Sequence, residues 1–245
     1  MELTQAGSTL YKYAKEILDM HGIAKRAVAD LMELVTGKLT IGASLTIGEY
    51  VLPHLLAAYS RKYPDVKLSV IIGNTEEMHE KALDGSIDIG LVEGDLVDPH
   101  LEITEFLQDE LVFVIPKQHP MAMKNVVDNN ELAENTFILR EEGSGTRLAM
   151  EKALQELSFK PKKQTVLGST QAIKEAVEAG LGISCLSKWT LRKELQLGIL
   201  KPLRMKDCNL TRGFYLIRYK GKFESKACAE FKRFILSDDI MQYLG

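Results

Sequence analysis

The sequence has little of several features that mark specialised classes of protein. Only three cysteines occur among 245 residues, at positions 185, 208 and 228, and no two of them have a CxxC spacing. Such a set argues against a disulfide framework and favours a reducing compartment. No apolar run approaches the ~20 residues that span a bilayer, and the N-terminus lacks the basic and apolar regions of a signal peptide. These absences predict a cytoplasmic protein with no membrane partner.

An excess of charge of one sign is also absent. The 31 basic and 34 acidic side chains give a formal charge of −3, which argues against a broad basic face that binds nucleic acid on its own.

Common catalytic patterns are missing as well. The segment Gly143–Arg147 lacks the lysine of a phosphate-binding P-loop, and the chain has neither a GxSxG nor an HExxH motif. We therefore expect no enzyme, no metal site and no cofactor.

After Gly37 the sequence alternates between short apolar runs and amphipathic stretches. A composition of 45% apolar and 27% charged residues is that of a globular protein, large enough for one or two folded units. We expect strands at 39–42, 66–72, 87–92, 111–115, 136–139, 164–167, 183–186 and 211–219, and helices at 48–62, 76–83, 128–133, 146–157, 170–179 and 224–236. This alternation predicts an α/β fold with mostly parallel sheets, and its restart near 115–117 predicts two lobes.

Residues 9–35 contain no proline and are predicted to form one long helix. Apolar residues recur along it at spacings of four and three, which is typical of a coiled-coil seam or a helix-packing face. They are Tyr13, Ile17, Met20, Ala24, Ala27, Leu31 and Leu34. A helix of this length would extend for roughly 40 Å, which favours packing on a partner chain. The alternative is an amphipathic helix that lies on its own domain.

Three expected strand-to-helix junctions carry small or hydroxyl-bearing residues. They are Ser44 and Thr46, then Ser144, Gly145 and Thr146, and finally Ser169. Open α/β sheets bind ligands beyond the carboxyl ends of their strands, so these junctions are candidates for one small-anion site. The alternative for each hydroxyl is a simple helix cap.

Four carboxylates, Asp84, Asp88, Glu93 and Asp95, cluster around one expected helix and strand. Because a turn and a strand end are usually open to water, we interpret most of them as solvated. Paired carboxylates can act as acid and base, but no accompanying residue supports that role here.

Several motifs together resemble a known family. The segment Leu3-Thr4-Gln5-Ala6-Gly7-Ser8-Thr9-Leu10 is similar to the one that joins the winged helix-turn-helix to the linker helix in LysR-type transcriptional regulators. Gly37–Ser44 and Leu52–Leu55 resemble the start of that family's effector-binding domain. Further matches, in family order, are Tyr63-Pro64, Leu83–Leu91, Pro116–Pro120 and Ile173–Ile183. This ordered set covers essentially the whole chain, which is therefore identified as a member of the family.

The resemblance implies the two-lobed fold of type 2 periplasmic binding proteins, preceded by a linker helix within residues 1–36. The effector-binding domain would span 37–245, with lobe I at 37–115 and 214–245 and lobe II at 117–212. Two crossing strands would form the hinge. An effector would lie between the lobes, at family positions that match the three junctions above and also Thr75.

The resemblance also implies partners. Family members carry a DNA-binding domain before the motif at which this chain begins, so we expect a fragment that reaches DNA only through that domain, as a homodimer or a tetramer. The segment Arg140–Arg147 is similar to that of members controlling sulfur assimilation. Its amide and hydroxyl donors favour a small anionic effector, either an oxyanion or a small carboxylate. Two alternatives remain: a solute-binding protein of a transport system, and an enzyme that uses the cleft.

Overall fold

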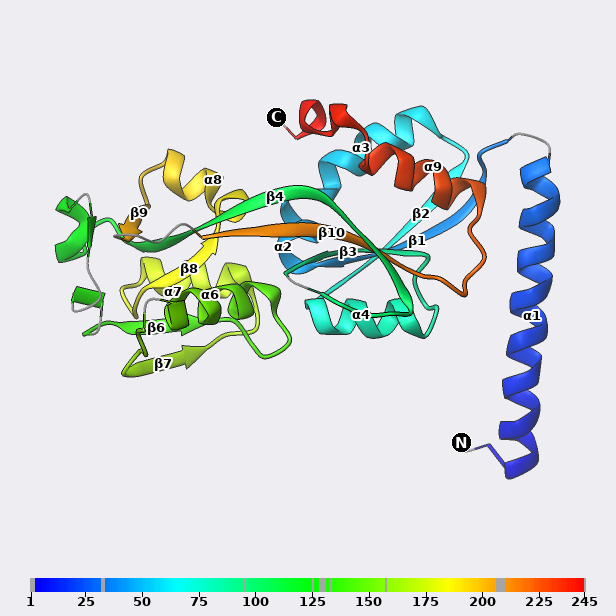
Figure 1. Ribbon diagram of the computed structural model, residues 1–245, viewed down its shortest axis with the longest axis horizontal. Coiled ribbons are helices and arrows are strands. Elements are labelled where there is room, and N and C mark those ends of the chain that lie inside the picture. Colours follow the sequence, from blue (N-terminus) through cyan, green and yellow to red (C-terminus); the bar gives the residue numbers. More distant parts are fainter. Residues whose placement is uncertain are drawn as a thin grey trace.

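The computed structural model describes residues 3–31, 34–94, 96–124, 126–127, 131–132, 134–156, 158–205 and 210–244. Its helices are α1 (Gln5–Leu31), α2 (Leu45–Tyr50), α3 (Leu52–Lys62), α4 (Thr75–Leu83), α6 (Gly145–Glu156), α7 (Thr170–Glu178), α8 (Lys188–Gln196) and α9 (Lys226–Ile235), with 3₁₀ turns at η1 (Pro120–Met123) and η2 (Asp238–Tyr243). Its strands are β1 (Gly37–Ser44), β2 (Val66–Gly73), β3 (Ile89–Glu93), β4 (Leu101–Pro116), β5 (Val126–Val127), β6 (Thr136–Leu139), β7 (Lys163–Val166), β8 (Ser184–Ser187), β9 (Leu200–Met205) and β10 (Thr211–Tyr219). Figure 1 shows two lobes side by side, with α1 beyond the first.

The first lobe is built on the parallel strands β2, β1 and β3. Leu39, Ile41 and Ala43 of β1 are fully buried, and alternate residues of a strand point to one face of the sheet. They share a core with Tyr59 of α3 and Phe231 of α9, whose rings meet edge to face with their centroids 5.1 Å apart. In Figure 1, α3 and α9 lie on one side of this sheet and α4 lies on the other.

The long strands β4 and β10 pass from one lobe to the other. β4 pairs antiparallel with β10 from Leu101 to Glu110, and then with β8 and β9 from Leu111 to Pro116. β10 also pairs antiparallel with β3. One mixed sheet therefore runs through the molecule in the order β2-β1-β3-β10-β4-β9-β5, with β8 also on β4. The expectation of mostly parallel sheets is wrong for these crossing strands, because they connect the lobes instead of alternating with helices.

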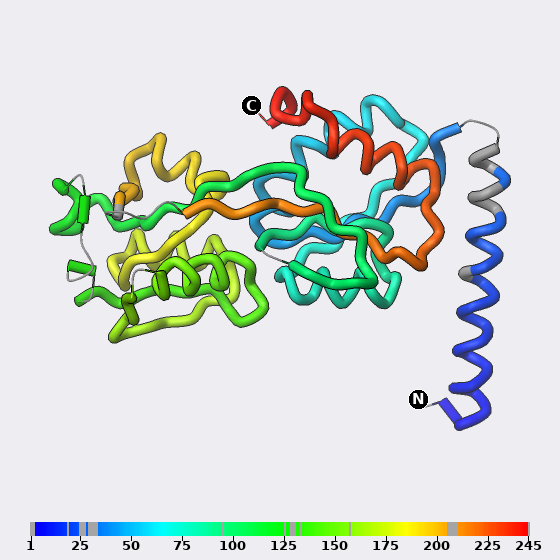
Figure 2. The backbone as a smooth tube through the Cα atoms, viewed as in Figure 1, coloured from blue at the N-terminus to red at the C-terminus, as the bar shows by residue number. Residues whose placement is uncertain are grey.

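The second lobe packs α6, α7 and α8 around the far half of β4 and the parallel pair β6 and β7. Phe113 of β4 and Phe137 of β6 are both buried and meet edge to face, with ring centroids 6.3 Å apart. Figure 2 shows how the chain enters this lobe along β4 and leaves it along β10. Each lobe therefore has its own apolar core, and the crossing strands contribute residues to both.

Most expected elements are present, with differences that have physical causes. The helix expected at 48–62 is two helices, α2 and α3, separated at Val51. Pro53 explains the break, because its ring would clash with the carbonyl of Glu49 in a continuous helix and it has no N–H to donate. The sequence analysis missed α8, β9 and the first ten residues of β4. The helix expected at 128–133 lies mostly outside the described residues.

The helix α1 stands apart from the sheet in Figures 1 and 2. It begins at Gln5, after Thr4, which the sequence offers with Ser8 as a candidate cap, and the Thr4 hydroxyl accepts a hydrogen bond from the Gly7 N–H at 3.1 Å. Tyr13, Ile17 and Met20 of the predicted seam are 56–68% exposed. The side chains of Ala27 and Leu31 lie outside the described residues. In the part of the chain that the structure describes, no helix is both long and apolar enough to cross a membrane.

Candidate functional site

The carboxylate of Glu93 lies at the end of β3 and is held by hydroxyl groups from both lobes. Its side chain is only 2% exposed. The Ser44 hydroxyl donates to Glu93 Oε2 at 3.0 Å, and the Thr46 hydroxyl donates to Oε1 at 3.2 Å. From the second lobe, the Thr146 hydroxyl donates to the same Oε1 at 3.0 Å. Two of the three predicted junctions therefore meet at one buried carboxylate.

A guanidinium group completes the cluster. Arg212 of β10 places Nη1 3.2 Å from Glu93 Oε1 and donates from Nη1 to the Thr146 hydroxyl at 3.0 Å. Its Nε donates to Asp109 Oδ2 at 2.9 Å, and the Ser187 hydroxyl donates to Asp109 Oδ1 at 2.7 Å. Arg212 and Asp109 belong to the crossing strands. The network therefore joins both lobes and the hinge between them.

Burial shifts the pKa of Asp109. Desolvation raises the pKa of this carboxyl above its ordinary value, although Arg212 and the Ser187 hydroxyl act in the opposite direction. With Glu93 and Asp109 ionised, the three side chains carry two negative charges and one positive charge. The Glu93 carboxylate is thus an acceptor surrounded by hydroxyl and guanidinium donors. With both carboxyl groups ionised, the net charge of the cluster is negative.

The backbone at the same point brings the lobes into close contact. A β-carbon on Gly145 would lie 2.3 Å from the Glu93 carbonyl oxygen and 2.7 Å from its Cγ, so only glycine fits there. The Thr75 hydroxyl donates to that same carbonyl at 3.2 Å. Gly145 and Thr75, two of the predicted site residues, therefore fix the backbone of Glu93.

The remaining predicted residues, Ser144 and Ser169, act mainly as helix caps. The Ser144 oxygen accepts from the Arg147 N–H at 3.4 Å, and the Ser169 oxygen accepts from the Ala172 N–H at 3.0 Å. Ser144 is buried and, with Thr75 and Glu93, lines a cavity of about 210 Å³ between α4 and the start of α6. The described hydrogen bond of Ser169 stays within its own helix, so its contact with an effector stays a prediction.

A second cavity, of about 260 Å³, lies on the other side of Gly94 and Leu148, residues that line both cavities. Arg212 and Lys152 contribute to its wall. The two cavities flank the point where the lobes meet. Both therefore belong to the region in which the sequence predicts an effector.

Glu93 is an exception to the interpretation that most carboxylates of its group are solvated. The residue ends a strand of five buried residues, and three hydroxyl donors replace its water. Arg212 and Asp109 were not predicted at all. One feature of the sequence indicates that Arg212 has a buried partner. It precedes Gly213 and Phe214 at the start of an apolar strand, where an unpaired charge would be costly. No local pattern linked it to Glu93, which is far away in sequence.

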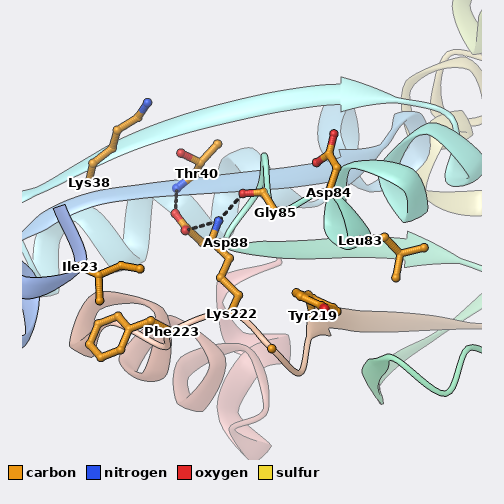
Figure 3. A pocket seen from close by; sticks show the side chains of 11 residues that line it. Ile23, Lys38, Thr40, Leu83, Asp84, Gly85, Asp88, Tyr219, Lys222 and Phe223 are labelled. Carbon is orange, nitrogen blue, oxygen red and sulfur yellow. Dashed lines mark hydrogen bonds and ion pairs between the residues drawn. The ribbon is translucent and has the colours of Figure 1, made fainter. Parts of the chain in front are cut away.

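A separate cavity of about 440 Å³ lies where α1 approaches the first lobe (Figure 3). Ile23 of α1 and Phe223 lie near one another on its wall. Lys222 donates to the carbonyl oxygens of Gly85 and Ile87 and pairs with Asp88 at 2.9 Å. The Lys222–Asp88 ion pair in this cavity thus joins two segments of the first lobe.

The chemistry open to the inter-lobe cluster is binding by hydrogen bonds and charge. It combines hydroxyl donors, a guanidinium and buried carboxylates. Among the described residues, no group of three or more His, Cys, Asp and Glu side chains could hold a metal ion.

Comparison with known proteins identifies the family. The sequence model of the LysR substrate binding domain matches residues 33–239. The chain is 39% identical to the HTH-type transcriptional regulator CysL of Bacillus subtilis over 209 residues, which are 85% of this chain and 70% of that protein. It is 32% identical to a probable RuBisCO transcriptional regulator of Trieres chinensis over 235 residues, which are 93% of this chain and 76% of that protein.

Solved structures agree with this assignment. The regulatory domain of Synechocystis CcmR in complex with 2-PG superposes with a TM-score of 0.74 at 30% identity, covering 82% of this chain and 96% of that one. The effector-binding domain of QuiR in complex with shikimate has the same fold, with a TM-score of 0.74 at 24% identity, covering 82% of this chain and 96% of that one. The named relatives are transcriptional regulators, and none supports a solute-binding protein of a transport system. The chain belongs to the LysR family of transcriptional regulators and contains the family's effector-binding domain.

Proposed function

We propose that the chain senses a small anionic effector at the Glu93 cluster and passes its binding state to a DNA-binding domain through α1. The observation that carries this proposal is that the site already holds a carboxylate. Ser44, Thr46 and Thr146 donate to Glu93, and Arg212 pairs with it. Donors arranged in this way suit an oxyanion or a small carboxylate, and charge-assisted hydrogen bonds of this kind are strong.

Control would follow from the relative stability of two arrangements of the lobes. The cluster draws donors from both lobes, so a ligand that replaces any of these contacts binds one arrangement better than the other. The equilibrium then shifts by no more than the difference in the ligand's affinity for the two arrangements. β4 and β10 connect the lobes and carry Asp109 and Arg212, so a change at the cluster reaches the hinge directly.

The helix α1 is the proposed route from the first lobe to DNA. Ile23 lines the cavity between α1 and the first lobe. Tyr13, Ile17 and Met20 present exposed apolar side chains that a second copy of the chain would cover. The proposal therefore includes a homodimer, or a tetramer built from dimers, acting on DNA in the cytoplasm.

The effector class includes the oxyanions and amino-acid precursors suggested by the likeness to regulators of sulfur assimilation. CysL and the RuBisCO regulators are both similar to this chain.

A thermal-shift titration tests the proposed site. Sulfate, sulfite, thiosulfate, phosphate, acetylserine and dicarboxylates are titrated into the chain, because a ligand that binds only the folded state stabilises it by about 2.7 kcal/mol at a hundredfold excess over Kd. We expect one class of anion to raise Tm. Thr146→Val should abolish that rise, because valine keeps the volume and removes the hydroxyl.

The matched control is Ser237→Ala, which removes a hydroxyl that donates to the Phe234 carbonyl, outside the cluster. This variant should respond to the anion as the unaltered chain does. An anion response that survives in Thr146→Val would show that the effector binds elsewhere. The absence of a response to every anion would contradict an anionic effector.

A further inference from the structure

The position of Glu93 restricts which anions the site can accept. A site that binds any oxyanion needs only donors, whereas here a carboxylate acceptor lies among the donors Ser44, Thr46 and Thr146. An anion that enters this cluster must share the donors with Glu93 or displace it from them. The residue at position 93 therefore affects which anions can bind to the cluster.

The backbone of Glu93 is fixed at this point. Its carbonyl oxygen accepts a hydrogen bond from the Thr75 hydroxyl at 3.2 Å, and the backbone of Gly145 packs against its carbonyl and Cγ. Its side chain is 2% exposed, so the carboxylate has little contact with water in this arrangement of the lobes. An entering anion would consequently meet Glu93 at close range.

Arg212 does not neutralise this surplus of negative charge. Asp109 already holds its Nε at 2.9 Å, and Asp109 is itself fully buried. The guanidinium therefore lies between two carboxylates, and an added anion brings further negative charge into a poorly solvated cluster. Burial of unpaired like charges is costly unless a hydrogen bond links them.

Anions differ in whether they can supply that hydrogen bond. Sulfate carries no proton at neutral pH, so all its oxygens are acceptors and each would face Glu93 as a like charge. Hydrogen phosphate has nearly the same size and shape, but it keeps at least one P–OH group at neutral pH. That group can donate to Glu93, while the other oxygens accept the hydroxyl protons of Ser44, Thr46 and Thr146 that Glu93 then releases.

We propose that Glu93 is a specificity-determining residue, which makes the site select oxyanions that carry a hydrogen-bond donor and reject those that carry none. Hydrogen phosphate is the simplest ion of the first class, and sulfate is the reference ion of the second. The inference rests on the proposed function, because it assigns a ligand chemistry to the same site. It also changes the expectation for that site, since sulfate becomes a poor ligand.

Isothermal titration calorimetry of the full chain with phosphate and with sulfate, at neutral pH and constant ionic strength, tests the inference. The unaltered chain should bind phosphate at least about tenfold more tightly than sulfate, because a site built around a hydrogen bond rejects an analogue that lacks it. In Glu93→Gln the preference should fall to about twofold or less, because the neutral amide can donate to a sulfate oxygen.

Glu80→Gln is the matched control. Glu80 lies on α4 and loses the same charge on substitution, but it is exposed and does not line the cavity that Glu93 lines. This variant should keep the tenfold preference. An equal loss of preference in both variants would mean that general charge, and not the acceptor at position 93, sets selectivity.

The remaining outcomes separate the two proposals. Equal binding of sulfate and phosphate by the unaltered chain overturns the role of Glu93 and leaves the anion site intact. An unchanged preference in Glu93→Gln does the same. If neither ion binds the unaltered chain or Glu93→Gln, both the specificity inference and an oxyanion effector fail. Since the unaltered chain alone decides the first outcome, the test holds even if the glutamine variant does not fold.

Discussion

Gly145 of the second lobe lies so close to Glu93 of the first that a β-carbon on the glycine would be 2.3 Å from the glutamate carbonyl oxygen. This contact sets the distance between the two lobes where the hydroxyl donors meet. Side-chain atoms do not approach a backbone oxygen so closely, so one added methyl group must push the lobes apart.

Gly145→Ala is therefore expected to lower the free energy of unfolding by about 1–3 kcal/mol, the usual cost of overpacking a tight contact. Urea denaturation measures this change, and small-angle X-ray scattering measures the accompanying expansion. Gly168→Ala provides the control, because a β-carbon there would meet nothing within 4 Å. Equal destabilisation by both substitutions would show that the loss of glycine flexibility, and not the lobe contact, is responsible.

Arg212 holds two buried carboxylates at once. Arg212→Met keeps most of the side-chain volume but leaves Glu93 and Asp109 without their shared cation. We expect a loss of about 3–5 kcal/mol in the free energy of unfolding, as is usual when one partner of a buried ion pair is removed. Chemical denaturation would measure it. The exposed Arg204→Met should cost far less, and a similar cost would contradict the importance of the buried network.

Asp109 should make stability fall with rising pH. Burial raises its pKa in the folded chain above the ordinary value of 3.8. In the pH window that begins near 3.8 and extends upward to the raised pKa, the folded state holds a proton that the unfolded state has released. The contribution of Asp109 to the free energy of unfolding is then fully present at lower pH and is lost as pH rises through this window.

Urea denaturation of the unaltered chain and of Asp109→Asn across this window checks the sign. Asparagine cannot titrate, so the difference in stability between the two chains should shift in favour of Asp109→Asn as pH rises. The exposed Asp65→Asn is a reference for the loss of a carboxyl group without burial. A difference that is constant with pH would contradict a raised pKa for Asp109.

The buried cysteines should be inert in the folded chain. Burial raises the pKa of the Cys228 thiol to about 12, and Cys185 is buried in the core of the other lobe. Thiolates are the reactive form of cysteine, so a coloured disulfide reagent near pH 8 should label neither residue before unfolding. The Cys208→Ser variant isolates this pair, and both thiols should react in urea. Rapid labelling without denaturant would indicate local opening of the cores.

The sequence predicted the site in part because helix-capping hydroxyls are local signals. Ser44, Thr46 and Thr146 were identified from their places at strand-to-helix junctions, and the structure brings them to one carboxylate. Glu93 and Arg212 were not recognised as their partners, because a buried charge is stabilised by contacts between segments far apart in the chain. Local sequence patterns do not predict such contacts.

In the fold, too, features set by local sequence were predicted and features set by contacts between distant segments were missed. The parallel strands of the first lobe and α4 were predicted within a few residues, since their apolar patterns and stops are local. The first ten residues of β4 were missed because polar and apolar residues mix irregularly along 101–110, where the strand is only half buried. The strand exists there because β10 pairs with it, and pairing between distant segments leaves little trace in either one.

The exposed seam of α1 leads to the last prediction. Ile17 is 68% exposed, and Tyr13 and Met20 lie on the same face one turn away on either side. If a second copy covers this face, Ile17→Glu places a charge in an apolar seam and should convert a dimer to a monomer in multi-angle light scattering. Lys12→Glu, at an exposed polar position of the same helix, should leave the oligomeric state unchanged. A monomeric unaltered chain, or a dimer that survives Ile17→Glu, would show that α1 does not supply the interface.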